Sequence, residues 1–171
     1  CGDSFGYEAW QEHFELPCLN LFNPDVRSYL FDVIRFWIDE FDIDGIRLDC
    51  ANVLDFNFMK EMRQETARMK EDFWLMGEVI HGDYSRWVNP QMLHSVTNYE
   101  LHKSLYSGFN DHNFFEIAHN VRRLEAIGRQ LYTFVDNHDE DRIASKLKLK
   151  EHLIPIYLCL FTLPGIPSIY Y

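Results

Sequence analysis

The 171-residue chain is poor in the features that mark nucleic-acid-binding and membrane-spanning proteins. It has only 16 Lys and Arg against 27 Asp and Glu, and the resulting net charge of -11 would repel phosphate backbones and anionic lipid surfaces. Its longest apolar stretch, Leu153 to Leu163, has about half of the ~20 residues that a membrane-spanning helix needs, and Pro155 interrupts it. We therefore expect no nucleic-acid partner and no membrane association.

Cysteine is scarce and widely spaced. The four cysteines, Cys1, Cys18, Cys50 and Cys159, include no Cys-x-x-Cys pair that would indicate a zinc knuckle or a redox centre, and we interpret them as reduced thiols. Reduced thiols favour a reducing compartment, so we expect a cytoplasmic location. Because the chain begins with Cys-Gly-Asp rather than Met, a signal peptide could precede residue 1.

Several short catalytic motifs are also absent. The sequence has no G-x-G-x-x-G or Walker pattern, no His-Glu-x-x-His and no Gly-x-Ser-x-Gly. These absences argue against a nucleotide-binding sheet, a zinc protease and a serine hydrolase, and we expect no metal ligands. Ser107-Gly108 is expected to form a turn.

Apolar periodicity instead predicts alternating helices and strands. Asn23-Pro24-Asp25 is typical of a helix start, with Asn23 as the cap and Pro24 at the first helical position. Asn113 and Glu116 resemble a capping box for a helix that stops at Gly128. Further helices are predicted at 57–70 and 152–162, and strands at 43–48, 73–79, 95–101, 131–135 and 166–171.

Strands that alternate with helices predict an α/β fold with a parallel sheet. Three acidic residues follow predicted strands: Asp49, Glu78 29 residues later, and Asp139 a further 61 residues on. These spacings are roughly one and two βα units of about 30 residues, which places the acids on one rim of the sheet. With no phosphate loop the sequence favours a barrel over a doubly wound sheet. Since a full barrel takes ~250 residues, residues 1–171 are interpreted as one unit, a fragment of a (β/α)8 barrel domain.

Three carboxylates on one rim suit the cleavage of a glycosidic bond, because they can stabilise an oxocarbenium-like transition state. A proton donor that works near neutral pH needs a raised pKa, so the apolar neighbours of Glu78 favour it for this role. Arg47 alternates with Asp49 along its strand, so both side chains should point to the same side. An isolated Asp after a strand is more often a helix cap, and the prediction depends on finding three together.

The three segments resemble the α-amylase superfamily of glycoside hydrolases, which are built on a (β/α)8 barrel. Its Gly-x-Arg-x-Asp motif appears as 45–49, its acid/base strand end as Gly77-Glu78, and its Asn-His-Asp as 137–139. The resemblance implies that Asp49 is the nucleophile, Glu78 the acid/base and Asp139 the third acid, with Arg47 and His138 in support. It further implies a retaining enzyme that needs no cofactor for its chemistry.

Shorter segments are similar to the neopullulanase and cyclomaltodextrinase group. Leu16-Pro17-Cys18-Leu19-Asn20 resembles that group's Met-Pro-Lys-Leu-Asn, with Cys18 in place of Lys, and Asp49-Cys50-Ala51-Asn52 resembles Asp-Val-Ala-Asn. Asn52 and Asn137 are therefore candidate sugar-binding residues. The resemblance implies substrates such as maltodextrins, cyclodextrins or pullulan, allows a homodimer of the full-length protein, and leaves a structural calcium ion undecided.

The same resemblance numbers the strands four to eight. A barrel without its first three strands lacks sugar-binding residues of the third strand, so we expect the fragment to be inactive alone. Two other functions stay open: a catalytically silent relative that serves as a binding or scaffold subunit, and a metal-dependent hydrolase on a similar barrel.

Overall fold

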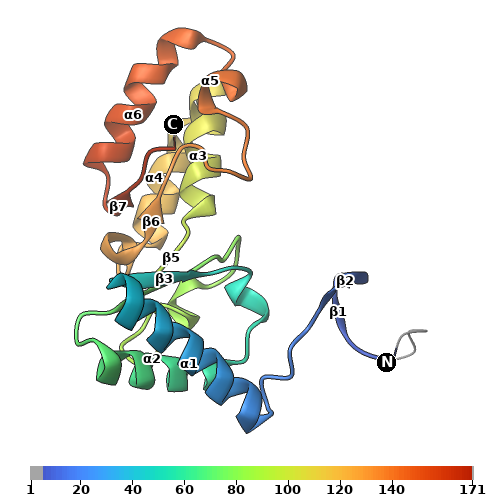
Figure 1. The fold of residues 1–171 in the computed structure, drawn as a ribbon. Coiled ribbons are helices and arrows are strands. Elements are labelled where there is room, and N and C mark those ends of the chain that lie inside the picture. The colour runs from blue at the N-terminus through green and yellow to red at the C-terminus, as the bar shows by residue number, and fades with distance from the viewer. Residues whose placement is uncertain (1–5, 171) are drawn as a thin grey trace.

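The computed structural model describes residues 6–170 and has the alternating helices and strands of an α/β protein (Figure 1). Its strands are β1 (Ala9–Trp10), β2 (His13–Pro17), β3 (Gly45–Leu48), β4 (Trp74–Gly77), β5 (Ser95–Val96), β6 (Tyr132–Thr133) and β7 (Ile166–Pro167). Its α-helices are α1 (Pro24–Phe41), α2 (Phe56–Met69), α3 (Tyr99–Asn110), α4 (Phe114–Arg123), α5 (Ile143–Lys146) and α6 (Leu153–Thr162). Short 3-10 helices lie at Ala51–Val53, Tyr84–Arg86, Gly128–Gln130 and Lys150–His152.

The strands from β3 to β7 are parallel and neighbour one another in chain order. β3 pairs with β4 and β4 with β5, while β6 pairs with β7. A single parallel bridge between Thr97 and Tyr132 connects the two sheets, and the Asn98 N–H donates to the Tyr132 carbonyl at 2.8 Å. Among the described residues β3 and β7 each pair on one side only, so these strands do not close into a barrel.

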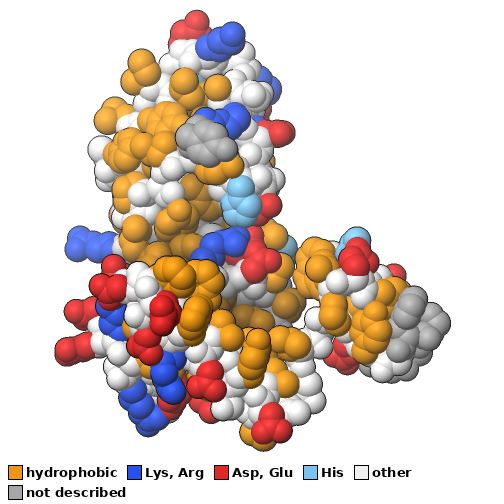
Figure 2. Space-filling model, in the orientation of Figure 1, with side chains coloured by type: hydrophobic (Ala, Val, Ile, Leu, Met, Phe, Trp, Pro, Cys, Tyr) orange, Lys and Arg blue, Asp and Glu red, His pale blue; other side chains and the backbone are white. Residues whose placement is uncertain are grey.

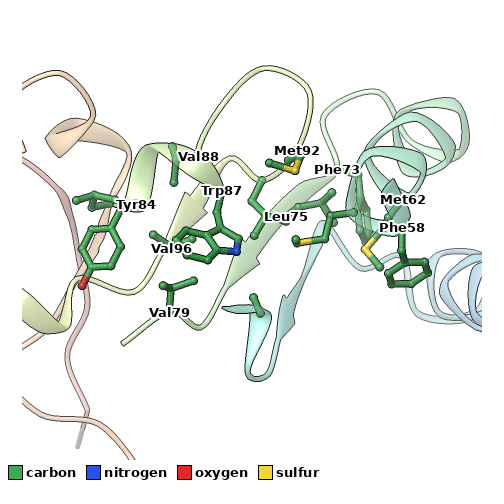
Figure 3. Packing of buried hydrophobic residues seen from close by; sticks show 14 of the residues in the cluster. Phe58, Met62, Phe73, Leu75, Val79, Tyr84, Trp87, Val88, Met92 and Val96 are labelled. Carbon is green, nitrogen blue, oxygen red and sulfur yellow. The ribbon is translucent and has the colours of Figure 1, made fainter. Parts of the chain in front are cut away.

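Helices α1 and α2 cover one side of β3 and β4 (Figure 1). Phe31 of α1 and Phe58 of α2 stack with ring centroids 5.7 Å apart. Beyond them Leu75 of β4 is fully buried, and the core continues to Trp87 and Val96 on the other side of the strand (Figure 3). This apolar cluster holds the carboxyl ends of β3 and β4 in fixed register.

A second apolar cluster joins α3, α4 and α6. It includes Leu105 of α3, Ile117 of α4 and Ile156 of α6, together with Val135, which follows β6. The outer side of α6 leaves Ile154, Leu158 and Phe161 exposed, and Figure 2 shows hydrophobic side chains over this part of the surface. Phe36, Trp37 and Phe41 of α1 are also exposed.

The first two strands form an antiparallel hairpin that the apolar periodicity did not predict. In Figure 1 the hairpin lies beside the other elements and is joined to α1 by an extended segment. Gln11 and Glu12 have positive φ angles of 47° and 65°, which make the tight turn between the strands.

Several predicted elements are confirmed. Asn23 caps α1 by accepting a hydrogen bond from the Asp25 N–H at 2.8 Å, with Pro24 at the first helical position. The helices predicted at 57–70 and 152–162 correspond to α2 and α6. The predicted strands are all present but shorter, because the residues at their ends are not paired with a neighbouring strand. Tyr171, at the end of the last predicted strand, lies outside the described residues.

The prediction of a strand through Leu101 and of a turn at Ser107-Gly108 is wrong. Residues 99–101 and Ser107-Gly108 belong to α3, which starts after Asn98 because the Asn98 side chain accepts a hydrogen bond from the Leu101 N–H at 3.0 Å. Gly108 is helical and packs closely on Ile117 of α4, where a Cβ would lie 3.2 Å from the isoleucine side chain. Helix pairing therefore outweighs the local turn preference of Ser-Gly.

The prediction of a capping box at Asn113 and Glu116 is also wrong, although the predicted helix is present as α4. The Asn113 side chain makes no capping bond, and the Glu116 carboxylate accepts from the Ser107 hydroxyl at 2.8 Å instead. α4 ends at Arg123 rather than near Gly128.

The described cysteines, Cys18, Cys50 and Cys159, are free thiols as expected, and Cys1 lies outside the described residues. Among the described residues, no helix combines the length and apolar composition of a bilayer span.

We expect Gly77→Ala to destabilise the protein by about 1–3 kcal/mol, since overpacking a core forces its neighbours to move. A Cβ at Gly77 would lie 2.5 Å from Leu93 Cδ1 and 2.7 Å from the Ala51 Cβ. Urea unfolding of the variant measures the change. Gly128→Ala is the matched control, because a Cβ there meets only the Pro164 Cβ, at 3.6 Å. Equal stability of the two variants would contradict the prediction.

Candidate active site

The register of β3 and β4 brings two of the predicted catalytic residues side by side. Leu48, the last residue of β3, pairs with Gly77, the last residue of β4. Asp49 and Glu78 are the next residues on each strand, and the Glu78 N–H donates to the Leu48 carbonyl at 2.8 Å. The closest ligand atoms of these two carboxylates lie within 4.8 Å of each other.

Arg47 bridges the two carboxylates. Its Nη1 lies 2.9 Å from Asp49 Oδ1 and its Nη2 lies 3.0 Å from Glu78 Oε1. The expected alternation along β3 is therefore observed: Arg47 and Asp49 point to the same side. The planar guanidinium fixes both carboxylates and offsets the repulsion between two negative charges at this separation.

The two carboxylates differ sharply in their exposure. Glu78 is buried, with 7% of its surface accessible, whereas the Asp49 side chain is 75% exposed. Besides Arg47, the Glu78 carboxylate accepts from the Cys50 N–H at 3.0 Å and from the Tyr99 hydroxyl at 3.3 Å. These three donors satisfy the buried carboxylate, which would otherwise lose its contacts with water at a cost in free energy.

Asp139 reaches the site from a turn and not directly from a strand end. β6 ends at Thr133, and the acid nearest that end is Asp136, which is buried and accepts from the Ile143 N–H at 2.8 Å at the start of α5. Asp139 is exposed, and its carboxylate lies 3.0 Å from His138 Nε2. The prediction that each acid directly follows its strand is therefore wrong for Asp139.

Asn137 shapes the turn that carries Asp139. Its side-chain oxygen accepts from the Asp139 N–H and the Glu140 N–H, both at 2.9 Å. Its side-chain nitrogen donates to the Tyr99 hydroxyl at 3.1 Å. The amide of Asn137 is therefore bonded on both sides within the protein.

A cavity of about 750 Å³ brings Asp49, Glu78, His138 and Asp139 together. The hairpin supplies part of its wall through Trp10, Glu15, Leu16, Pro17 and Cys18, and the remaining lining residues are Cys50, Ile80, Tyr99 and Glu140. In Figure 2 acidic and histidine side chains gather where the two groups of helices meet, on the side that faces the hairpin. The cavity is large enough for a small-molecule ligand.

The other predicted site residues lie outside the cavity lining. Arg47 binds two of the lining residues, Asp49 and Glu78, and Asn137 is bonded to a third, Tyr99. Asn52 is exposed on the 3-10 helix that follows Asp49, and it is not among the described residues that line the cavity.

The sequence reasoning missed Tyr99, Cys50 and the hairpin residues. Tyr99 could have been found from the rule that polar groups after parallel strands share one rim, if the strand at 95 had been ended before Asn98. Burial raises the pKa of the Tyr99 hydroxyl, with further upward contributions from the charges of Glu78 and Asp139, so the hydroxyl keeps its proton. The family resemblance singled out Leu16-Pro17-Cys18-Leu19-Asn20, but it did not predict that a hairpin here lines the cavity.

Asp49, Cys50 and Glu78 form the one group among the described residues that could ligate a metal ion, with ligand atoms within 4.8 Å of one another. Burial, followed by the charges of Asp49 and Glu78, raises the pKa of the Cys50 thiol, which keeps it protonated. Arg47 already binds both carboxylates. A protonated thiol and a guanidinium do not suit a calcium ion, which takes six to eight oxygen ligands.

A family model for the alpha amylase catalytic domain matches residues 2–171. The chain belongs to the alpha-amylase family. Among curated relatives of this family, the chain is 32% identical to the intracellular maltogenic amylase of Bacillus subtilis (strain 168), a match that covers 99% of the chain and 29% of the relative. It is 34% identical to neopullulanase 2 of Thermoactinomyces vulgaris, over 91% of the chain and 28% of that protein.

Solved structures of the alpha-amylase family agree with the fold. A cyclomaltodextrinase structure superposes with a TM-score of 0.88 and 29% identity, and the match covers 96% of this chain and 30% of that one. The chain thus spans about 30% of the length of these relatives. Its strands and helices are those of a part of an alpha-amylase catalytic domain.

Proposed function

We propose that this chain is the part of a retaining glycoside hydrolase that carries the catalytic acids, and that the whole protein cleaves α-glucosidic bonds. One observation carries the proposal: Arg47 joins Asp49 and Glu78 at neighbouring strand ends, with carboxylate atoms within 4.8 Å, in a cavity that Asp139 also lines. The printed names of the relatives support maltodextrins, cyclodextrins or pullulan as substrates.

In the proposed reaction the exposed Asp49 carboxylate attacks the anomeric carbon while the bond to the leaving oxygen breaks. Glu78 gives its proton to that oxygen. A water molecule then attacks the same carbon, Glu78 takes the proton of this water, and Asp49 leaves as a carboxylate. Asp139 holds the hydroxyl groups of the distorted sugar. Both steps need only carboxylates and water, so the proposed chemistry requires no cofactor.

The position of Glu78 beside Asp49 in the cavity lining supports its role as the acid of the first step and the base of the second. His138 and Asn52 remain proposed sugar contacts. For Asn137 the structure favours a role in holding the turn, because its amide is already bonded on both sides.

We further propose that the chain forms strands four to eight of a (β/α)8 barrel. The support is the parallel order of β3 to β7, in which the Thr97–Tyr132 bridge makes the two sheets continuous. The family resemblance allows a homodimer, and the name of the intracellular maltogenic amylase supports a cytoplasmic location.

Glu78→Gln in the full-length protein should lower kcat/KM on cyclodextrin by about a hundredfold or more, because general acid catalysis contributes on the order of 10²–10⁴. Release of reducing sugar measures the rate. Glu71→Gln, an exposed carboxylate after α2, is the control for loss of a negative charge. Undiminished turnover by Glu78→Gln would refute the assignment, and a wild-type protein that binds but never cleaves glucan would favour the silent binding subunit.

The products should keep the anomeric configuration of the substrate. Retaining glycosidases hold their carboxyl groups ~5–5.5 Å apart, whereas inverting enzymes need ~6.5–9.5 Å to admit a water molecule. The approach of the Asp49 and Glu78 ligand atoms to within 4.8 Å supports the shorter class. Proton NMR of the freshly released sugar distinguishes the two, and an initial excess of the β anomer from an α-glucan would be the contrary result.

The 171-residue chain alone should hydrolyse little or no cyclodextrin. β3 and β7 each have one unpaired edge among the described residues, and the Asp49 side chain is 75% exposed rather than enclosed. The measurement compares the purified chain with the full-length protein at equal concentration, with circular dichroism to check that the chain is folded. Robust turnover by the short chain would contradict this expectation.

A further inference from the structure

Tyr99 lies between two catalytic elements that are far apart in sequence. It is the first residue of α3, directly after Asn98, whose backbone N–H is bonded to Tyr132 and whose side chain caps the helix. The Tyr99 ring is buried edge-to-face on Phe134, with centroids 4.9 Å apart and planes at 81°. The backbone and the ring are therefore both fixed, and the position of the hydroxyl is set in advance.

The direction of the hydrogen bonds at this hydroxyl follows from Asn137. The Asn137 side-chain oxygen is occupied by two backbone N–H groups, those of Asp139 and Glu140. Its nitrogen must therefore face Tyr99, and it donates to the hydroxyl oxygen at 3.1 Å. The Tyr99 hydroxyl in turn has its own proton to give, and the acceptor within reach is Glu78 Oε1 at 3.3 Å.

These bonds form one chain that leads from the Asp139 backbone through Asn137 and Tyr99 to Glu78. Building on the proposed function, we infer that Tyr99 is a positioning residue: its hydroxyl, oriented by Asn137, fixes the Glu78 carboxylate relative to the turn that carries Asp139. Tyr99 acts through Glu78 and exchanges no proton with the sugar. A phenylalanine ring would fill the same space and lack only this connection.

The second carboxylate oxygen of Glu78 connects this network to the backbone next to Asp49, the proposed nucleophile. Oε2 accepts from the N–H of Cys50, the residue after Asp49. Without the Tyr99 bond, Oε1 keeps Arg47 as a partner but the side chain gains freedom, so its bond to the Cys50 N–H weakens as well. The Cys50, Asp139 and Glu140 amides are three reporters of one network.

Amide hydrogen exchange tests the inference without any catalytic assay. In Tyr99→Phe of the full-length protein, exchange of the Cys50, Asp139 and Glu140 amides should be about tenfold faster, as expected for loss of one hydrogen bond to a charged group. Tyr132→Phe is the matched control, because it removes a half-buried hydroxyl that bonds Ser168 and makes no contact with Glu78. Unchanged exchange in Tyr99→Phe would overturn the inference, whether or not the protein cleaves glucan.

Kinetics supply a second readout that a purely structural role would not move. Tyr99→Phe should lower kcat on cyclodextrin about tenfold with KM nearly constant, since the lost bond orients a catalytic group and not the sugar.

The outcomes separate the two hypotheses. If the wild-type protein cleaves no α-glucan, the proposed function fails, and amide exchange alone decides the role of Tyr99. If wild type is active and Tyr99→Phe matches it in kcat, the positioning role fails and the proposed function stands. An unfolding midpoint of Tyr99→Phe close to that of Tyr132→Phe shows that any effect is local.

Discussion

The guanidinium of Arg47 is the contact on which the rest of the site depends. Two carboxylates whose atoms approach within 4.8 Å repel each other unless a positive charge lies between them, and Arg47 binds both. The contact requires Arg47 and Asp49 on one side of β3, with Glu78 at the matching position of β4. The register of the two short strands therefore determines how the acids are arranged. A one-residue slip of β4 against β3 would point the Glu78 side chain away from Arg47.

Tight packing behind the carboxylates protects that register. Gly77 lies so close to Ala51 and Leu93 that it has no room for a side chain, and the Ala51 N–H donates to the Glu78 carbonyl at 2.9 Å. The backbone on both sides of the acid pair is thus bonded or closely packed, and Arg47 holds both carboxylates. Asp139 depends on a different device, a turn held by the Asn137 amide.

Local signals predicted those parts of the structure that local forces determine. Asn23 and Pro24 predicted the start of α1, and the spacing of Asp49 and Glu78 predicted that both acids follow parallel strands, because strand period and helix capping act over a few residues. The start of α3 was not predicted, because its apolar face is determined by packing against α4 and α6, which are distant in sequence. Tyr99 and the hairpin were missed for the same reason: their contacts join segments that are distant in sequence.

The hairpin contributes to the cavity wall but holds none of the acids. Trp10 and Leu16 form one wall of the cavity, yet the hairpin lies apart from the strands that hold the acids (Figure 1). Substitutions there can reshape the entrance without disturbing a single bond of the carboxylate pair. The contour of the cavity can therefore be altered through a peripheral ribbon while the acids keep their own partners.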